Sequence, residues 1–158
     1  MAATGVLGAR LYTSATALTN VEAAADAIGD FQGLTIATEI GLIESLGDFG
    51  TVFETVPFMD VATGRTYKLR GGSNHGQFQM TIGQDLTDAG QAALKSYVTS
   101  DQNNYPFKIT LVGADASYDT VYFGAKVMSF RTTLGAANAV IRATITLEIN
   151  TPIFIGAS

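Results

Sequence analysis

The sequence predicts a mainly β domain with one inserted α-helix, arranged as a β-sandwich or a β-barrel. Beyond residue 33, apolar and polar residues mostly alternate, which is the period of a half-buried strand. Residues 87–100 combine an apolar stripe of helical period with a capping residue, which predicts the main helix. No linker or internal repeat divides the 158 residues, so one domain is expected over 1–158.

The N-terminal region is expected to contain little regular structure. Residues 1–19 are expected to form an extended arm or an edge strand. Residues 20–29 predict a short helix, with Asn20 as its cap and Gly29 as its stop. A helix of this length is unstable alone in water, so it is expected to dock on the rest of the domain.

Two strands and a long connection are predicted next. Residues 34–42 alternate with period two, and residues 49–58 form a second apolar run. Pro57 cannot donate a hydrogen bond to a neighbouring strand, so this run is expected to lie at a sheet edge or to end there. Residues 59–76 contain four glycines and predict a long loop.

The middle of the chain predicts a strand followed by the main helix. Residues 77–85 alternate cleanly. Thr87 or Asp88 is expected to cap the helix over 87–100, and Gln91 stands at the spacing of a capping box from Asp88.

The last third predicts three strands, two turns and a short apolar tail, for six or seven strands in all. The strands are expected at 107–112, 120–130 and 139–149, the turns at 113–119 and 134–138, and the tail at 150–158. Long strands with apolar ends leave unpaired edges, which pair with other chains unless they are protected.

The composition indicates that other subunits cover part of the surface. Apolar residues make up 47% of the chain, but charged residues make up only 15%, against about 25% in typical soluble domains. Monomers normally need surface charge to stay soluble and unassociated. The alternative is a neutral surface of Thr, Ser and Gly.

Several classes of protein do not fit this sequence. No apolar run reaches the length of about 20 residues that spans a bilayer, and the first residues do not resemble a secretory signal. The absence of cysteine excludes disulfides and thiolate metal sites. The net charge of −5 argues against a nucleic-acid binder held by clustered Lys and Arg.

No pattern of residues predicts an active site, so an enzyme is not expected, and no catalytic, cofactor or metal residue is assigned. His75 is the single histidine, which excludes a zinc site built on several histidines. Glu39 and Glu44 stand five apart on an alternating segment and would point to opposite faces. Asp85 and Asp88 flank the helix start, where capping explains them. A small carbohydrate-binding or hydrolytic β domain would need an exposed aromatic platform or paired carboxylates.

An ordered series of short motifs resembles the tail tube (major tail) proteins of long-tailed, non-contractile bacteriophages. The motifs are TEIG at 38–41, ESLGDFG at 44–50, LRGG at 69–72, DLTDAGQAAL at 85–94 and the NxYPFKITL pattern at 103–111. Each motif alone is weak, whereas their order and spacing together are more specific. The similarity covers most of the chain from about residue 30 onward.

The resemblance implies a structural virion protein of the phage tail. Such subunits form hexameric rings, each subunit adding four strands to a continuous inner β-barrel. The rings stack helically around a tape-measure protein, contact terminator and distal tip proteins, and conduct DNA without binding it specifically. No cofactor and no membrane contact are implied. The alternative is a related ring or tube subunit of a secretion or tail-completion assembly.

The implied barrel is wide enough for duplex DNA. Strands at ~4.8 Å spacing and ~40° tilt, four from each of six subunits, give a backbone diameter of roughly 48 Å. An acidic lining would repel phosphate, so the acidic excess of the chain is expected to face the bore. Alternation suggests these lumen-lining candidates: Glu39, Glu44, Glu54, Gln77, Gln79 and Asp85.

The 59–76 segment is the candidate for contact between stacked rings, since it is locally basic in an acidic chain. Its candidate contact residues are Asp60, Arg65, Lys68, Arg70 and His75. The arm over 1–19 and the apolar tail over 150–158 are further candidates for contacts between subunits.

Overall fold

The computed structural model describes residues 5, 7–18, 27–100, 102–112 and 120–156, and its body is one strongly curled sheet. The strand order in this sheet is β2-β1-β7-β8-β9-β6-β3, with β10 also paired to β8. All strand pairs among the described residues of this sheet are antiparallel. A mainly β fold with one main helix is therefore confirmed.

The strands of the curled sheet have the following bounds. They are β1 (Arg10–Thr13), β2 (Thr38–Ile40), β3 (Ile43–Leu46), β6 (Gln77–Gly83), β7 (Tyr105–Thr110), β8 (Thr120–Thr133), β9 (Arg142–Ile149) and β10 (Phe154–Gly156). The end strands β2 and β3 follow each other along the chain, joined at the corner formed by Gly41 and Leu42. The sheet thus curls almost into a barrel, but β2 and β3 do not pair with each other across the seam.

The core lies inside this curl. Period-two alternation directs one face of each long strand inward, and β9 shows it most clearly, with buried Ala143, Ile145, Leu147 and Ile149. Aromatic rings fill the centre: Phe123 contacts both Phe78 and Phe107, with ring centroids 5.7 and 5.6 Å apart. The body therefore has a complete hydrophobic core without help from a second chain.

The helix α3 (Ala89–Ser100) closes the curl at the corner between β2 and β3. Asp88 is its cap, since one carboxylate oxygen accepts the backbone N–H of Gln91 at 2.9 Å and the other accepts that of Gly41 at 3.1 Å. Gly90 packs directly on β2, where an added Cβ would lie 2.2 Å from the carbonyl oxygen of Glu39. Only glycine allows so close an approach.

Gln91 has a different role from the one that the capping-box spacing predicts. Its side chain is 1% exposed and accepts the backbone N–H of Asp85 at 2.9 Å. Its amide nitrogen donates to the carbonyl oxygens of Gly41 and Gly83, at 3.0 and 2.9 Å. Gln91 therefore fastens the helix start to the ends of two strands, rather than returning a hydrogen bond to Asp88.

Both ends of the chain differ from the predictions. β1 is flanked by β2 and β7, so residues 10–13 form an interior strand and not a free arm or an edge. Most of the predicted helix at 20–29 lies outside the described residues. The described helix α2 (Ile28–Gln32) runs through Gly29, which therefore does not stop it.

The C-terminal tail belongs to the fold. β10 pairs with β8, and the ring of Phe154 lies 5.8 Å from that of the buried Phe31. This small second core also contains Leu18, Ile36 and Tyr122. The tail is thus largely used within the chain, although Ile155 remains exposed.

Other boundaries move by a few residues. The strand predicted over 34–42 is reduced to β2, β7 begins two residues earlier than predicted, and β8 continues to Thr133. The turn predicted at 134–138 separates β8 from β9, whereas the one at 113–119 lies outside the described residues.

We expect Gln91→Ala to lower the free energy of unfolding by about 2–4 kcal/mol. The change leaves two carbonyls and one N–H without their buried partner and opens a cavity. Urea unfolding followed by circular dichroism measures the loss. Gln102→Ala is the matched control, because Gln102 is exposed, and a shift within about 0.5 kcal/mol is expected there. Equal effects of the two substitutions would contradict the bridging role of Gln91.

Candidate assembly surfaces

A two-stranded ribbon leaves the body and packs on none of it. β4 (Val52–Met59) and β5 (Thr66–Asn74) pair only with each other and project far from the curled sheet. Every residue of β4 is exposed, and so is nearly every residue of β5. The segment at 59–76, predicted as a loop, therefore contains the tip and the second strand of a hairpin. We call residues 52–74 the hairpin.

The two faces of the hairpin differ. Cross-strand partners share a face, so Val56 and Leu69 lie together, as do Phe58 and Tyr67, and they form an apolar face. Their side chains range from 45% to 59% exposed. Exposed apolar faces of this kind are typical of surfaces that pack against another molecule.

The other face of the hairpin is basic. It carries the pairs Thr55–Arg70, Pro57–Lys68 and Met59–Thr66. The guanidinium of Arg70 lies over the ring of Phe53, 4.5 Å from its centroid. The basic cluster predicted from the sequence therefore exists, but it lies on the opposite face from the apolar pairs.

The predicted contact residues are spread along the whole hairpin. Asp60 organises the turn at the tip, where its carboxylate accepts the backbone N–H of Ala62 and the hydroxyl of Thr63. Arg65 also lies at the tip, while Lys68 and Arg70 follow along β5. His75 lies at the base, with its Nδ1 3.0 Å from the hydroxyl of Thr51. Asp60 therefore has a local role in the turn, whereas the cations Arg65, Lys68 and Arg70 are exposed.

A second surface is the outward face of β3, β6, β9 and β8, which we call the polar face. Strand register places its side chains in rows, for example Gln79, Thr146 and Ser129, then Thr81, Thr144 and Arg131. The polar face comprises Glu44, Ser45, Gln77, Gln79, Thr81, Lys126, Ser129, Arg131, Thr133, Arg142, Thr144, Thr146 and Glu148. Hydroxyl side chains are its most frequent kind, and the face is hollowed between β6 and β8.

The structure brings three of the six predicted lumen-lining residues to this face. Glu44, Gln77 and Gln79 lie on it. Glu39 lies on β2 across the seam, 3.6 Å from Arg10, and Glu54 lies on the hairpin.

Asp85 follows β6, where the hydroxyl and N–H of Thr87 hold the pKa of its carboxyl below the usual value. Its role in this turn is local, as the capping interpretation anticipated.

The polar face is not acidic. Lys126, Arg131 and Arg142 face only two described acids there, Glu44 and Glu148. Glu44 pairs with Arg142, and Glu148 accepts a hydrogen bond from Gln77 at 2.7 Å. The alternation of residues 139–149 did signal two of the missed residues, Arg142 and Glu148, whereas Lys126 and Arg131 became recognisable only through the register of β8.

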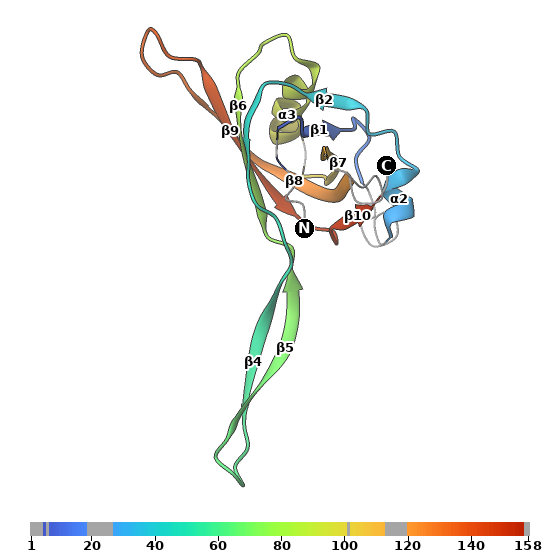
Figure 1. The fold of residues 1–158 in the computed structure, drawn as a ribbon, viewed down its shortest axis with the longest axis vertical. Coiled ribbons are helices and arrows are strands. Elements are labelled where there is room, and N and C mark those ends of the chain that lie inside the picture. Colours follow the sequence, from blue (N-terminus) through green and yellow to red (C-terminus); the bar gives the residue numbers. More distant parts are fainter. Residues whose placement is uncertain (1–4, 6, 19–26, 101, 113–119, 157–158) are drawn as a thin grey trace.

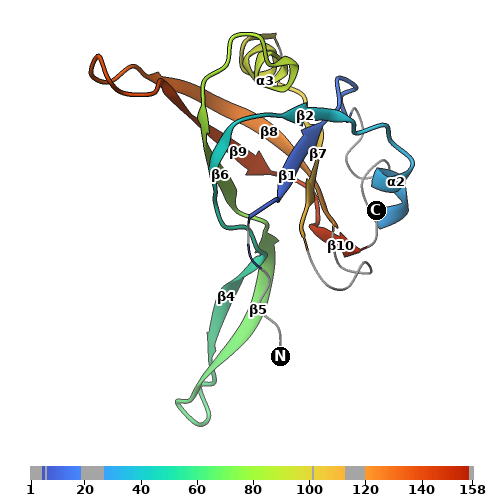
Figure 2. The ribbon, with the colours of Figure 1, turned by 45° about the horizontal axis from the view of Figure 1, so that its top comes forward.

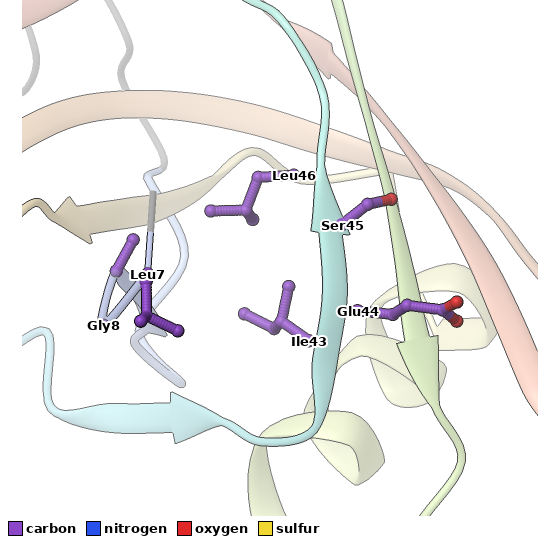
Figure 3. A pocket seen from close by; sticks show the side chains of 7 residues that line it. Leu7, Gly8, Ile43, Glu44, Ser45 and Leu46 are labelled. Carbon is purple, nitrogen blue, oxygen red and sulfur yellow. The ribbon is translucent and has the colours of Figure 1, made fainter. Parts of the chain in front are cut away.

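A groove runs beside β3 at the seam of the curl. Figure 3 shows Ile43 and Leu46 pointing from β3 toward Leu7 and Gly8, while Glu44 and Ser45 point away toward the polar face. A neighbouring hollow continues along the corner between β2 and β3 and shares Gly8, Ala9 and Ile43 with the first. The side chains of Leu7, Ile43 and Leu46 therefore give the groove an apolar lining on one side of β3.

The described residues hold no cluster of three or more candidate metal ligands. Within the same part of the chain, no helix has the length and apolar character needed to cross a bilayer. Burial raises the pKa of Tyr97, whose hydroxyl donates to the backbone carbonyl of Ser14 at 2.7 Å. This contact holds α3 against the body of the domain.

Comparison with solved structures identifies the architecture. A sheath/tube terminator of an extracellular contractile injection system (PVC) matches with a TM-score of 0.67 at 15% identity, over 99% of each chain. The SPP1 tail tube matches with a TM-score of 0.62 at 13% identity, over 98% of this chain and 80% of that one. The tail of a GTA particle matches with a TM-score of 0.57 at 12% identity, over 89% and 100%.

The chain has a tail-tube fold. No family model matches the sequence, and no curated protein does either. The tail-tube resemblance of the motifs is thus supported at the level of the fold. The matches include contractile injection systems, so they give no support to the narrower prediction of a non-contractile tail.

We expect the hairpin to contribute almost nothing to the stability of the unassembled chain. Val56→Ala and Leu69→Ala should change the free energy of unfolding by less than about 0.5 kcal/mol, because neither side chain contacts the core. Ile145→Ala is the contrast and should cost roughly 2–5 kcal/mol, since Ile145 is fully buried. Chemical denaturation at low protein concentration provides the measurement. A large loss for the hairpin variants would show that the ribbon folds back on the body.

Proposed function

We propose that this chain is a structural, non-catalytic subunit of a phage tail tube, in which hexameric rings stack helically and conduct DNA. The observation that carries the proposal is the hairpin, a ribbon with one exposed apolar face, outside a body whose core is already complete. An isolated two-stranded hairpin is marginally stable at best in water. The hairpin is therefore expected to gain stability when another subunit covers its apolar face.

The fold supports this role, and the descriptions of similar structures support the ring. The anti-feeding prophage baseplate that matches this chain was treated with six-fold symmetry, and the GTA tail with helical refinement and C6 symmetry. We therefore assign six subunits to a ring. The assembled particle, a virion tail built in the bacterial host, is the proposed location.

The hairpin is the proposed contact between rings. Its tip and the segment between β6 and α3 lie at opposite ends of the long axis, and that segment exposes Leu86 and contains Asp85. Two different surfaces at opposite ends give a head-to-tail contact, which generates an open filament. This geometry suits stacking without limit better than a closed dimer.

The apolar face of the hairpin contributes most to this contact. Each half-exposed large side chain gains about 1 kcal/mol on burial, whereas an exposed ion pair contributes roughly 0–1 kcal/mol and weakens in salt. Lys68 and Arg70 then set orientation and partner choice more than affinity. Stacking is therefore expected to persist at high salt.

The polar face is the proposed lining of the bore. Its hydroxyl-rich rows and nearly balanced charge offer DNA and a tape-measure protein few strong contacts. Glu44, Gln77 and Gln79 remain lumen candidates on this basis. Terminator and distal tip proteins would close the two ends of the tube.

A second candidate role is a tail-completion ring or a secretion-type tube. Two matching structures are described as a sheath/tube terminator and a tube-terminating cap. A terminator forms one ring at the end of a tube, whereas a tube subunit forms many. The length of assemblies made by the pure chain separates the two roles.

We expect Val56→Ser combined with Leu69→Ser to stop stacking but leave single rings intact. The exchange removes the apolar pair that one ring presents to the next. Negative-stain microscopy of concentrated protein tests this, with tubes expected for the unmodified chain. Lys68→Gln combined with Arg70→Gln is the matched pair on the basic face and should still form tubes at high salt. Only monomers at every concentration would contradict the proposed function, and tubes from the serine variant would contradict the role of the apolar face.

A further inference from the structure

The hairpin is joined to the body by two short connections. Residues 47–51 lead from β3 into β4, and residues 75–76 lead from β5 into β6. No residue of β4 or β5 is buried. The direction in which the hairpin leaves the body is therefore decided at these few residues, which we call the base, and not by packing of the ribbon itself.

Phe49 fastens the first connection to the core. Its ring lies against that of Phe78, with the centroids 6.4 Å apart and the ring planes at 51°. Phe78 is fully buried and contacts Phe123 at the centre of the body. Phe49 is 37% exposed, so most of its surface is covered although it lies outside any strand. The ring is held both by its buried area and by the tilted geometry of the aromatic pair.

Polar contacts join the second connection to the body and to the first. The side-chain oxygen of Asn74 accepts the backbone N–H of Gly76 at 2.9 Å. The carbonyl oxygen of Gly76 accepts the N–H of Ile149 at 3.1 Å, which holds this connection to the end of β9. Across the base, the hydroxyl of Thr51 lies 3.0 Å from Nδ1 of His75. The two connections are therefore coupled, and the position of one constrains the other.

The remainder of the base is thinly packed. The first connection approaches β6 at Gly47, where an added Cβ would lie 2.3 Å from the carbonyl oxygen of Gln79. Only glycine fits so close to a neighbouring backbone. Beyond this contact a hollow opens beside Phe49, lined also by Asp48, Val52 and Gln77. Loss of the Phe49 ring would enlarge this hollow and leave the hairpin free to turn about residues 47–51.

We propose that Phe49 is a positioning residue for assembly, which sets the direction of the hairpin before any second copy binds. The proposal rests on the proposed stacking role of the hairpin. It also gives a function to the ESLGDFG motif at 44–50, which contains both Gly47 and Phe49. A segment that already holds its bound direction loses less freedom on binding. A chain whose hairpin points correctly for only a fraction of the time binds more weakly by that fraction.

Spin labels measure the direction of the hairpin without interference, because the chain contains no cysteine of its own. Ala62→Cys places one label at the exposed tip of the hairpin, and Ala92→Cys places the other on an exposed position of α3. Double electron–electron resonance on the dilute, unassembled chain gives the distribution of distances between the labels. We expect one narrow distribution for this labelled chain and a distribution about twice as wide when Phe49→Ala is added.

Phe53→Ala is the matched control. Phe53 is also a partly exposed aromatic residue, but its ring lies under the guanidinium of Arg70 within the hairpin. Its loss should leave the distribution narrow. Phe49→Tyr keeps the ring against Phe78 and should also leave the distribution narrow. Urea unfolding followed by circular dichroism checks that the body of each variant is folded.

Sedimentation at rising protein concentration connects the direction of the hairpin with assembly. The concentration above which tubes sediment is expected to rise about fivefold or more for Phe49→Ala and to stay within about twofold for Phe49→Tyr. A purely structural loss in the body would not widen the distance distribution, so the two measurements together identify positioning.

A wide distribution in the chain with Phe49 intact, or an equally narrow one with Phe49→Ala, would overturn the proposal. If tubes still form, the proposed function stands. An unchanged threshold for Phe49→Ala in spite of a wider distribution would overturn the link to assembly. Absence of tubes at every concentration would contradict the proposed function and the assembly role with it, whereas the distances would still decide whether Phe49 fixes the hairpin.

Discussion

The constraint on which this structure depends is that apolar β-surface must be covered and strand edges must be paired. The body meets it for one curled sheet, whose inward faces bury the aromatic centre around Phe123. It does not meet it for the hairpin, for residues 128–141 at the end of the β8–β9 ribbon, or for the edge of β3. The same chain therefore folds as a unit and remains incomplete as a surface, which is the condition for assembly from identical copies.

This arrangement offers a physical reason for the low fraction of charged residues in the sequence. Two surfaces combine exposed apolar side chains with few charges: the groove at the seam, and residues 128–141 at the end of the β8–β9 ribbon. The hairpin carries Lys68 and Arg70 on one face and leaves the face of Val56 and Leu69 apolar. The remaining charge is distributed differently from the sequence-based expectation. The polar face carries more described cations than acids. Under the proposed function, low adhesion to DNA would therefore rest on internal pairing, such as Arg142 with Glu44, instead of repulsion.

The sequence predicted the elements whose local signals agree with their tertiary setting. β6, β9 and α3 each have clear periodicity, and Asp88 caps its helix as expected. β5 was missed because a ribbon exposed on both faces shows no alternation, and its glycines and cations are typical of a loop. β1 and β10 are too short to carry a pattern and depend on neighbours distant in sequence.

The sequence indicates which residues belong to the candidate surfaces, but not which of them share a face. The sequence located the basic cluster at 65–70, yet only strand register shows that Lys68 and Arg70 lie opposite the Val56–Leu69 pair. In the same way, alternation found Gln77 and Gln79, but only the sheet order shows which strands share their face. Pairing between distant segments decides these points, and a single sequence does not encode it locally.

Amide hydrogen exchange, compared between the unassembled chain and its sedimented assembly, tests the central claim most directly. The account predicts strong slowing of exchange on assembly in the hairpin, residues 52–74. It predicts the same in residues 43–46 and 126–133, where each strand has a described neighbour on one side only. It predicts little change in α3 or in the buried part of β9, which the chain already protects alone. Unchanged exchange in the hairpin and at the two edges, in a sample that has sedimented as tubes, would contradict it.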